Sequence, residues 1–359
     1  MDSNTYCVIM AGGTGSRFWP LSKISHPKQF VDILGSGKTL LQQTFARFEN
    51  ICPKENIFIV TNAQHKEIVF EQVPELNKSR ILFEPSSRGT APCIAYACRI
   101  IQKINPEANL IVTPSDHYIC NETNFRSTIQ KALLESEKED KLITLGIRPS
   151  RPNTEYGYIQ YDEDFFKKDN PQLKKVVTFT EKPEQEMALQ FIESGDFLWN
   201  SGVFIWNLKT IESAFQKYLP DVYSLFMSIE DIDDADQIER VYAECRSVSI
   251  DYGIIEYAEN NYVMISDFGW SDISTWATLH DIQKKDKSQN AIIGRNVIAY
   301  DTRNCVVNMP KNKLVVLQGL DNYIVVENDN ILMVCKKSEE HLIKKFVSDV
   351  EIEKGDHYI

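Results

Sequence analysis

The residues with the clearest chemistry lie near the start of the chain. An apolar run, Tyr6–Met10, leads directly into the glycine-rich segment Ala11–Ser16. Glycine lets the backbone approach a ligand closely, and successive inward N–H groups form an anion-binding concavity. Two cations follow, Arg17 as a planar fork and Lys28 as a mobile point charge. This combination predicts a site that binds a polyphosphate.

Better-known phosphate loops do not match this segment. A P-loop ends in Gly-Lys-Ser/Thr, which does not close this segment, and the dinucleotide fingerprint needs a glycine where Phe18 stands. The alternative is a plain tight turn after a first strand. A turn alone does not require Arg17 and Lys28, so the sequence favours phosphate binding.

Two aspartates are candidates for binding a metal ion. Asp116 follows the apolar run Asn109–Thr113, and ligands in open α/β sheets lie at the carboxyl ends of the strands. A carboxylate there can hold Mg²⁺ while phosphates and water complete the coordination. Asp116 could instead cap the next helix or turn. Asp272 stands at a predicted helix start and fits an N-cap equally well, so the residues alone leave both alternatives open.

Residues 1–150 must position these side chains, and they alternate between strand-like and helix-like patterns. Such alternation predicts right-handed βαβ units around a mainly parallel sheet, and near-continuous apolar strands indicate a sheet buried on both faces. The predicted strands are Tyr6–Met10, Ile57–Thr61, Arg80–Glu84, Asn109–Thr113 and Lys141–Gly146. The predicted helices are Leu40–Asn50, Ala91–Ile104 and Asn124–Glu139.

The polar segment Gln283–Gln289 predicts a domain boundary, with residues 1–285 in the first domain and 290–359 in the second. Short β-rich segments after the boundary, roughly eight to ten residues apart, predict a β-helix or a meander. Ser338 and the acids that follow it predict the start of a terminal helix. Before the boundary, the predicted strands are Tyr156–Tyr161, Lys174–Glu181, Gly202–Trp206 and Tyr262–Asp267, and the predicted helices are Glu184–Ser194, Lys209–Tyr218 and Ser271–Lys284.

The composition is that of an ordinary globular protein and argues against several function classes. The 359 residues are 43% hydrophobic and 25% charged, with a net charge of −12. No Lys/Arg-rich block occurs, so we expect no binding to nucleic acid. No run of about 18 apolar residues and no signal peptide are present, so we expect no membrane association. Eight scattered cysteines without a Cys-x-x-Cys pair predict reduced thiols in the cytoplasm.

Several motifs together carry a resemblance to a known family. Trp19–Ser22 and Pro27–Phe30 extend the glycine segment, and Pro114–His117, Gly269–Asp272 and Glu181–Pro183 lie at later strand ends. Over essentially its full length, the chain resembles the mannose-1-phosphate guanylyltransferase branch of the sugar-nucleotide pyrophosphorylases. The resemblance implies a Rossmann-like (GT-A-like) α/β nucleotidyltransferase domain with a mixed, mainly parallel sheet, followed by a small left-handed β-helix module.

The resemblance also implies a reaction, the transfer of GMP from GTP to α-D-mannose 1-phosphate, which gives GDP-mannose and pyrophosphate. Mg²⁺ is the implied cofactor, with Asp116 and Asp272 as its ligands. Arg17, Lys28 and Lys182 are the implied catalytic residues, since they would neutralise charge on the phosphates during in-line attack. The family uses its terminal module for subunit contacts, which implies a homodimer.

Other motifs imply the residues that bind the two substrates. Glu181 offers an acceptor for a sugar hydroxyl and Lys182 a cation for the sugar phosphate, although the pair could also form a solvated surface salt bridge. The implied sugar-binding residues are Gly157, Glu181, Lys182, Asn200 and Asp251. The implied nucleotide-binding residues are Ala11, Gly12, Gly13, Thr14, Gly15, Ser16, Arg17, Glu84, Arg88, Thr90 and Ser115.

Two positions depart from the family pattern. Glu155 stands where the family has a glycine, two residues before Gly157, and Gly89 replaces an asparagine. The choice of hexose therefore stays open, and a nucleotidyltransferase for another sugar 1-phosphate, such as a heptose, is one alternative. The other alternative is a catalytically inactive regulatory homologue, against which the retention of the phosphate-binding and metal-binding residues argues.

Overall fold

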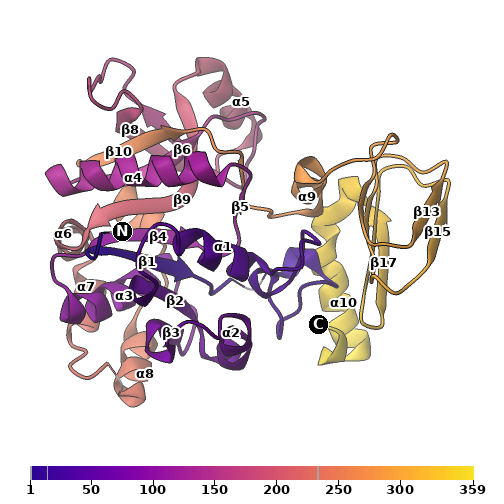
Figure 1. Cartoon of the computed structure of the whole chain (residues 1–359), viewed down its shortest axis with the longest axis horizontal. Coiled ribbons are helices and arrows are strands. Elements are labelled where there is room, and N and C mark those ends of the chain that lie inside the picture. Colours follow the sequence, from indigo (N-terminus) through magenta and orange to yellow (C-terminus); the bar gives the residue numbers. More distant parts are fainter. Residues whose placement is uncertain (1, 14, 233) are drawn as a thin grey trace.

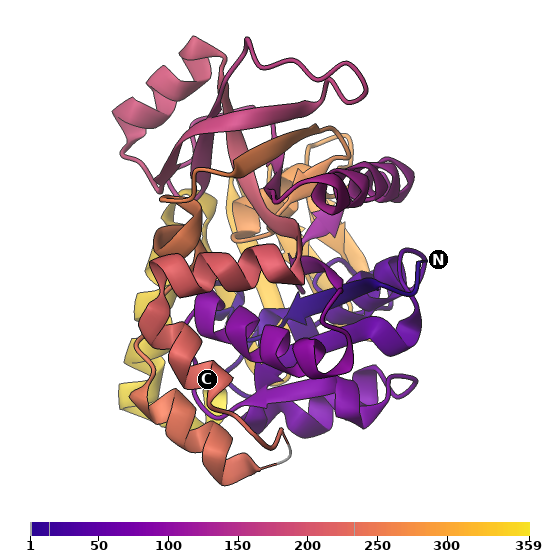
Figure 2. The same ribbon diagram turned by 90° about the vertical axis from the view of Figure 1, so that its left-hand side faces the viewer.

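The computed structural model describes residues 2–13, 15–232 and 234–359. Thr14, one of the predicted nucleotide-binding residues, lies outside the described residues, as does the side chain of Ser16. The chain forms a large α/β domain with a smaller β-rich module at its side (Figure 1), and the view in Figure 2 places this module behind the larger domain. None of the helices in the described ranges has the length and apolar character needed to cross a membrane.

A nine-stranded mixed sheet forms the centre of the larger domain, in the order β3-β2-β1-β4-β9-β6-β10-β8-β7. Its strands are β1 (Thr5–Met10), β2 (Ile57–Asn62), β3 (Ile81–Glu84), β4 (Asn109–Pro114), β6 (Leu142–Ile147), β7 (Gly157–Tyr161), β8 (Leu173–Glu181), β9 (Phe197–Asn207) and β10 (Asn261–Ser266). Strands β3, β2, β1 and β4 pair in parallel, as do β6 and β10, while β9, β8 and β7 pair with their neighbours antiparallel. The predicted α/β class with a mixed sheet is confirmed.

Helices cover both faces of this sheet, which explains why its strands are near-continuous apolar runs. Along β1, Tyr6 and Val8 join one layer of the core, while Cys7 and Ile9 join the other. The first layer contains α3 (Thr90–Ile104), α6 (Leu208–Tyr218), α7 (Pro220–Met227) and α8 (Ala235–Glu244). The second contains α1 (Leu40–Phe48), α2 (Lys66–Gln72) and α4 (Glu122–Lys138), and α5 (Gln185–Ser194) covers the β7–β9 end.

Short parallel strands stacked on one another build the C-terminal module. β12 (Ala291–Ile293), β14 (Val306–Asn308) and β16 (Tyr323–Asn328) form one stack, and β13 (Val297–Tyr300) and β15 (Val315–Gln318) form another. This repeated parallel stacking is typical of a β-helix. β17 (Ile331–Lys336) pairs antiparallel with β16, and α10 (Ile343–Lys354) runs between the module and the larger domain (Figure 1). The predicted β-helix-like module is confirmed.

The module shares an apolar core with the segment that follows the glycine run. Phe18, Trp19 and Trp276 pack in one buried cluster with Val306 of the module. The rings of Phe18 and Trp276 lie 4.9 Å apart, and the Trp19 indole N–H donates to the Tyr358 carbonyl at 2.8 Å. The module therefore stabilises the segment that carries Arg17.

The helix predicted from Ser271 begins later than expected. Trp270 and Ser271 instead form the short strand β11, which pairs with β5 (Tyr118–Ile119), and α9 runs from Trp276 to Ile282. Residue Ile273 has a φ of +42°, a left-handed conformation that a helix cannot contain. The prediction was wrong because this pairing and the turn that follows β11 depend on contacts distant in sequence.

Two further boundaries differ from the prediction. Strand β9 begins at Phe197 rather than at Gly202, because its first half pairs with β7 at the end of the sheet. The terminal helix α10 begins at Ile343, after a short 3-10 segment, so Ser338 does not cap it. Glu340 of that segment accepts the N–H of Ala277 at 3.0 Å. This contact holds the 3-10 segment against the first turn of α9.

Candidate active site

The residues predicted to bind phosphate and metal converge near the carboxyl end of β4. The ammonium group of Lys28 lies 2.8 Å from the Asp116 carboxylate. It also donates to the backbone carbonyls of Asp272 and Ile273, at 2.7 and 2.9 Å. Lys28 is buried, so these contacts form away from bulk water. The structure therefore brings together one lysine and two aspartates from three distant parts of the sequence.

A strained turn presents Asp272 to this cluster. The left-handed φ of the β-branched residue Ile273 is uncommon, and such strain concentrates at functional sites. The Asp272 carboxylate accepts the Tyr156 hydroxyl at 2.7 Å and the Ser274 N–H at 3.1 Å. Thr275 is the N-cap of α9, so the alternative that Asp272 caps this helix does not hold.

Asp116 is an ionised carboxylate beside a lysine, and it caps no described helix. The next helix, α4, has Asn121 as its N-cap. Burial raises the pKa of Asp116, but the charges of Lys28 and His117 outweigh burial, and its pKa lies below the ordinary value. The backbone N–H of Ser115 donates to the last carbonyl of β1 at 3.0 Å, which fixes the strand end that carries Asp116.

This set of groups suits a divalent cation. Lys28 supplies positive charge next to the Asp116 carboxylate and the Asp272 carbonyl, so the protein already stabilises a cation there. Among the described residues, no group of three or more His, Cys, Asp or Glu side chains could hold a metal ion. Mg²⁺ is usually held by only one or two carboxylates, with phosphate oxygens and water completing its shell. Asp116 and Asp272 fit that pattern.

The glycine segment is tied down through its carbonyl groups. The Gln29 amide donates to the carbonyls of Ala11 and Gly13, at 2.8 and 2.9 Å. Gly15 has a φ of +61°, and a Cβ there would collide with Lys28, so only glycine fits this close approach. Within the described ranges, the N–H of Gly13 donates no hydrogen bond, so it is available to an anion.

Arg17 contacts the residue that departs from the family pattern. Its guanidinium group lies 2.6 Å from the Glu155 carboxylate, and the side chains are 36% and 48% exposed. The hydrogen bond from Arg17 lowers the pKa of Glu155. Water screens such an exposed pair, so its contribution to stability is small and a phosphate can compete for Arg17.

A cavity of about 210 Å³ lies beside this cluster, and Asp272 and Thr90 are part of its wall. Gly157 makes room in the wall, because a Cβ there would collide with the Glu181 carboxylate. Residues predicted to bind the sugar line the cavity, namely Gly157, Glu181, Lys182, Asn200 and Asp251.

The cavity presents acceptors for hydroxyl groups and one cation. Burial, and then the charge of Asp251, raise the pKa of Glu181 to about 7, and burial raises the pKa of Asp251 to about 6. The Asn200 amide donates to Asp251 at 2.9 Å. Lys182 lies 3.7 Å from Glu181, and both line the cavity; Glu181 is largely buried but Lys182 is 55% exposed, so the alternative of a solvated pair stays open for Lys182.

Three further residues predicted to bind the nucleotide, Glu84, Arg88 and Thr90, lie at the end of strand β3 or after it, and Glu84 lies against the glycine segment. The buried Glu84 carboxylate accepts the Tyr242 hydroxyl at 3.0 Å, and burial raises its pKa to about 7. A Cβ on Gly12 would lie 3.3 Å from Glu84 Oε2, so this acid lies directly against the glycine segment. Arg88 donates to the Tyr242 carbonyl at 3.0 Å, and the Thr90 hydroxyl accepts a backbone N–H at 2.8 Å. In this structure Arg88 and Thr90 therefore order the surrounding loop.

Several side chains at the site were not predicted from the sequence. Gln29 holds the glycine segment, Tyr156 holds Asp272, and His117 lines the cavity while its Nδ1 lies 3.2 Å from the Trp270 indole N–H. Each stands next to a predicted residue or inside a motif that was recognised. Their position beside predicted residues was the only sign of a role in the sequence. Position alone does not distinguish a side chain that enters the site from one that points away.

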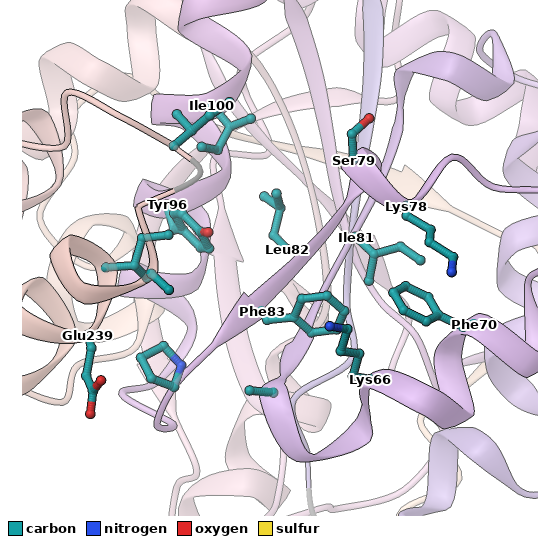
Figure 3. Close-up of a pocket in the computed structure, with 15 residues that line it drawn as sticks. Lys66, Phe70, Lys78, Ser79, Ile81, Leu82, Phe83, Tyr96, Ile100 and Glu239 are labelled. Atoms are coloured by element: carbon teal, nitrogen blue, oxygen red, sulfur yellow. The ribbon is translucent and has the colours of Figure 1, made fainter.

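A larger cavity, of about 640 Å³, lies along β3 (Figure 3). Phe70, Phe83 and Tyr96 line it together with Lys66 and Lys78. None of the predicted site residues is in its wall. The candidate active site is therefore the smaller cavity, where the predicted residues meet.

Two family models match the chain. The nucleotidyl transferase model matches residues 6–289. The model of the MannoseP isomerase/GMP-like beta-helix domain matches residues 295–350. The first match covers the nine-stranded sheet and its helices, and the second covers most of the C-terminal module.

Curated and solved proteins are similar over nearly the whole chain. Mannose-1-phosphate guanylyltransferase 2 of Escherichia coli O157:H7 is 34% identical over 371 residues, covering 100% of this chain and 76% of that protein. Mannose-1-phosphate guanylyltransferase of Salmonella montevideo is 36% identical over 362 residues, covering 98% and 75%. A structure from Thermus thermophilus, described as a mannose-1-phosphate geranyltransferase, has a TM-score of 0.87 at 30% identity, covering 97% of this chain and 99% of that chain.

Proposed function

Because the chain belongs to the nucleotidyl transferase family, and within it to the mannose-1-phosphate guanylyltransferases, we propose that it transfers GMP from GTP to α-D-mannose 1-phosphate. The products are GDP-mannose and pyrophosphate. The observation that carries this proposal is the convergence of Lys28, Asp116 and Asp272 beside a cavity with several acceptors and one lysine.

The cavity binds mannose 1-phosphate. Lys182 pairs with the phosphate, and the carboxylates of Glu181 and Asp251 accept hydrogen bonds from hydroxyl groups of the sugar. Asn200 already donates to Asp251, which orients that carboxylate toward the cavity. With these contacts, the phosphate of the sugar lies at the end of the cavity next to Asp272.

The glycine segment and its two cations bind the triphosphate. The N–H of Gly13 and the ammonium of Lys28 approach the phosphates, and Arg17 exchanges Glu155 for a phosphate oxygen when GTP binds. Gln29 holds the glycine segment in place before the substrate arrives, so the N–H of Gly13 needs no reorganisation. Arg17 and Lys28 exchange their carboxylate partners for phosphate oxygens.

The chemical step needs no nucleophile from the protein. A phosphate oxygen of mannose 1-phosphate forms a bond to the α-phosphorus of GTP, while the bond from that phosphorus to the α–β bridging oxygen breaks. The electron pair leaves with pyrophosphate. Lys182 and Lys28 hold the two reactants in line, so catalysis consists of positioning and electrostatic stabilisation.

We also propose that Asp116 and Asp272 hold a Mg²⁺ ion. Carboxylate oxygens suit this ion, and the ammonium of Lys28 already lies against the Asp116 carboxylate and the Asp272 backbone carbonyl. When bound, the ion would neutralise charge on the triphosphate. Lys28 would then be released from Asp116 to pair with a phosphate.

The proposal includes the compartment of the protein. The eight cysteines are free, which supports a reducing compartment such as the cytoplasm.

The proposal also includes a homodimer formed through the C-terminal module. One face of the β13–β15 pair exposes apolar side chains, which supports this assembly. The exposed residues are Ile298, Tyr300, Leu314 and Val316.

A substrate panel tests the proposed function. Pyrophosphate release is measured with GTP, ATP, UTP and dTTP, each with mannose 1-phosphate, glucose 1-phosphate and a heptose 1-phosphate. We expect the highest kcat/KM for GTP with mannose 1-phosphate. A higher value for another pair would replace the assigned substrates, and no release with any pair would identify an inactive homologue.

A further inference from the structure

A second polar cavity, of about 580 Å³, lies between the larger domain and the C-terminal module. Its wall includes Leu21 and the turn around Gly35 on one side, and Ile293 and Asn308 on the other. It shares no lining residue with the active-site cavity. Its volume lies within the range of small-molecule sites in proteins, roughly 300–1,000 Å³.

A buried amide without a partner belongs to a residue in the wall of this cavity. Asn308 ends β14 and is only 6% exposed, yet its Nδ2 has no hydrogen-bond partner among the described residues. Buried donors in native proteins are nearly always satisfied, so an orphaned one requires an explanation. Asn308 is part of the cavity wall, so a small shift of its side chain on binding would bring the buried Nδ2 within reach of an oxygen of a bound molecule.

The charges around the cavity favour an anion. Arg295 and Lys311 are part of the wall, are exposed, and form no ion pair within the described ranges. The acids of the wall are already engaged, because Asp32 accepts backbone N–H groups of its own turn and Glu327 pairs with Lys313. Among the described residues, Arg295 and Lys311 are therefore two cations without an ion pair, against one wall carboxylate, Asp32, that lacks a cationic partner.

We propose that this cavity binds a phosphorylated small molecule. Arg295 and Lys311 pair with the phosphate, since a dianion is best matched by two cations, and Asn308 Nδ2 donates to an oxygen of the ligand. The bound molecule touches Leu21, which follows the glycine segment, and Asn328 of the same wall donates to the Pro20 carbonyl at 3.0 Å. The site thus adjoins the segment that carries Arg17.

Hydrogen–deuterium exchange of the full-length protein locates such binding along the chain. Inorganic phosphate, GMP and mannose 1-phosphate are added separately, at concentrations that saturate the active site. We expect at least one of them to protect amides of residues 292–296 and 308–312 in the wild type. The three probes distinguish a free phosphate, a nucleotide and a sugar phosphate as the source of the phosphate group.

Variants separate this site from the active site. Arg295→Gln combined with Lys311→Gln should abolish protection of 292–296 and 308–312 while protection of the glycine segment remains. Asn308→Leu should do the same, and removing an orphaned donor should leave the melting temperature of the ligand-free protein equal or higher. Lys287→Gln combined with Lys336→Gln, which removes two exposed lysines outside the wall, is the charge-matched control.

Two results would overturn the proposal. One is that none of the three probes protects residues 292–296 and 308–312 in the wild type. The other is that the protection survives in the Arg295→Gln/Lys311→Gln protein, since it would then arise from the active site. Because these two side chains are exposed, their substitution tests binding even if Asn308→Leu fails to fold.

Discussion

Lys28 lies between two aspartates because three separate parts of the chain close on its ammonium group. The segment after the glycines carries the lysine, the end of β4 carries Asp116, and the strained turn at Ile273 presents the carbonyls. This contact pairs the charge of Asp116 with that of Lys28. We expect the same position to become part of a shared phosphate and metal site when substrates bind.

The two aspartates provide the first prediction. Asp116→Asn and Asp272→Asn should each lower kcat by at least about 100-fold, because each removes charge from one bound metal and even changes outside the coordination shell cost about 10–100-fold. Asn at position 272 can still accept the Tyr156 hydroxyl, so the fold should be retained. The measurement is kcat against Mg²⁺ concentration, with circular dichroism as the check on folding.

Asp281→Asn is the matched control, because Asp281 pairs with Arg151 on the surface of the protein. Its kinetics should equal those of the wild type. If Asp272→Asn kept a wild-type response to Mg²⁺, Asp272 would not be a metal ligand.

Lys182 and Arg17 should affect different substrates. Lys182→Ala should weaken binding of mannose 1-phosphate by about 1.5–3 kcal/mol, the cost of a lost charge-assisted hydrogen bond, and leave GTP binding nearly unchanged. Arg17→Ala should have the reverse effect. Isothermal titration calorimetry measures both affinities, and Lys209→Ala, an exposed lysine paired with Glu107, is the control. The opposite pattern would mean that the two phosphate sites are assigned the wrong way round.

Glu84 predicts a pH dependence of stability. Burial raises the pKa of this carboxyl from 4.5 to about 7, so the folded protein binds its proton more tightly than the unfolded chain does. The stability that results is complete below about pH 4.5 and is lost as the pH rises through about 7. Glu84→Gln does not titrate, so its unfolding free energy should fall less over this range, by up to about 3 kcal/mol. Urea unfolding at a series of pH values measures this difference, and parallel profiles for the two proteins would contradict it.

Residue types identified much of the candidate site, but not its internal contacts. The cations, the acids at strand ends and the glycines could be named because phosphate and Mg²⁺ restrict which side chains can bind them. The contacts of Tyr156 with Asp272 and of Arg17 with Glu155 could not be named, because they join segments more than a hundred residues apart. The roles of the cations, acids and glycines in binding phosphate and Mg²⁺ stay predictions until the variants are measured.

At the scale of elements, the five strands of residues 1–150 that belong to the central sheet were predicted to within two residues because both of their faces are apolar, whereas the two-residue strand β5 was not predicted. β9 and α9 were predicted less well. The first half of β9 is the apolar run Phe197–Trp199, but Asn200 and Ser201 of the site interrupt it before Gly202, and its pairing with β7 is not visible in the local sequence. Likewise, α9 could not be limited to Trp276–Ile282 without knowing that Ser271 pairs with β5.

The stacked strands β13 and β15 provide a prediction about assembly. Ile298 and Val316 face each other across this pair and are 45% and 59% exposed. Ile298→Lys combined with Val316→Lys should convert a dimer into a monomer, because two charges would be buried in an apolar interface. Light scattering measures the mass, and Ile24→Lys, an exposed apolar residue of the larger domain, is the control. A dimer that persists in the double variant would place the interface elsewhere.

At the scale of the whole molecule, the larger domain and the C-terminal module form one packed unit around Phe18 and Trp276. The polar segment after α9 predicts a boundary but gives no sign of this shared core, since aromatic residues next to a glycine loop fit either a core or a ligand site. The consequence is functional. The module supports the segment that carries Arg17, although it contributes none of the residues assigned to the chemistry.

The most direct test of this account is a single ³¹P NMR time course with GTP and mannose 1-phosphate whose phosphate oxygens carry ¹⁸O. Attack of the sugar phosphate on the α-phosphorus predicts GDP-mannose and pyrophosphate in equal amounts. All of the label stays on oxygens of the phosphate next to the sugar, including the oxygen that bridges it to the GMP phosphate, and none enters pyrophosphate. Label in pyrophosphate, release of inorganic phosphate in place of pyrophosphate, or unchanged substrates would contradict the account.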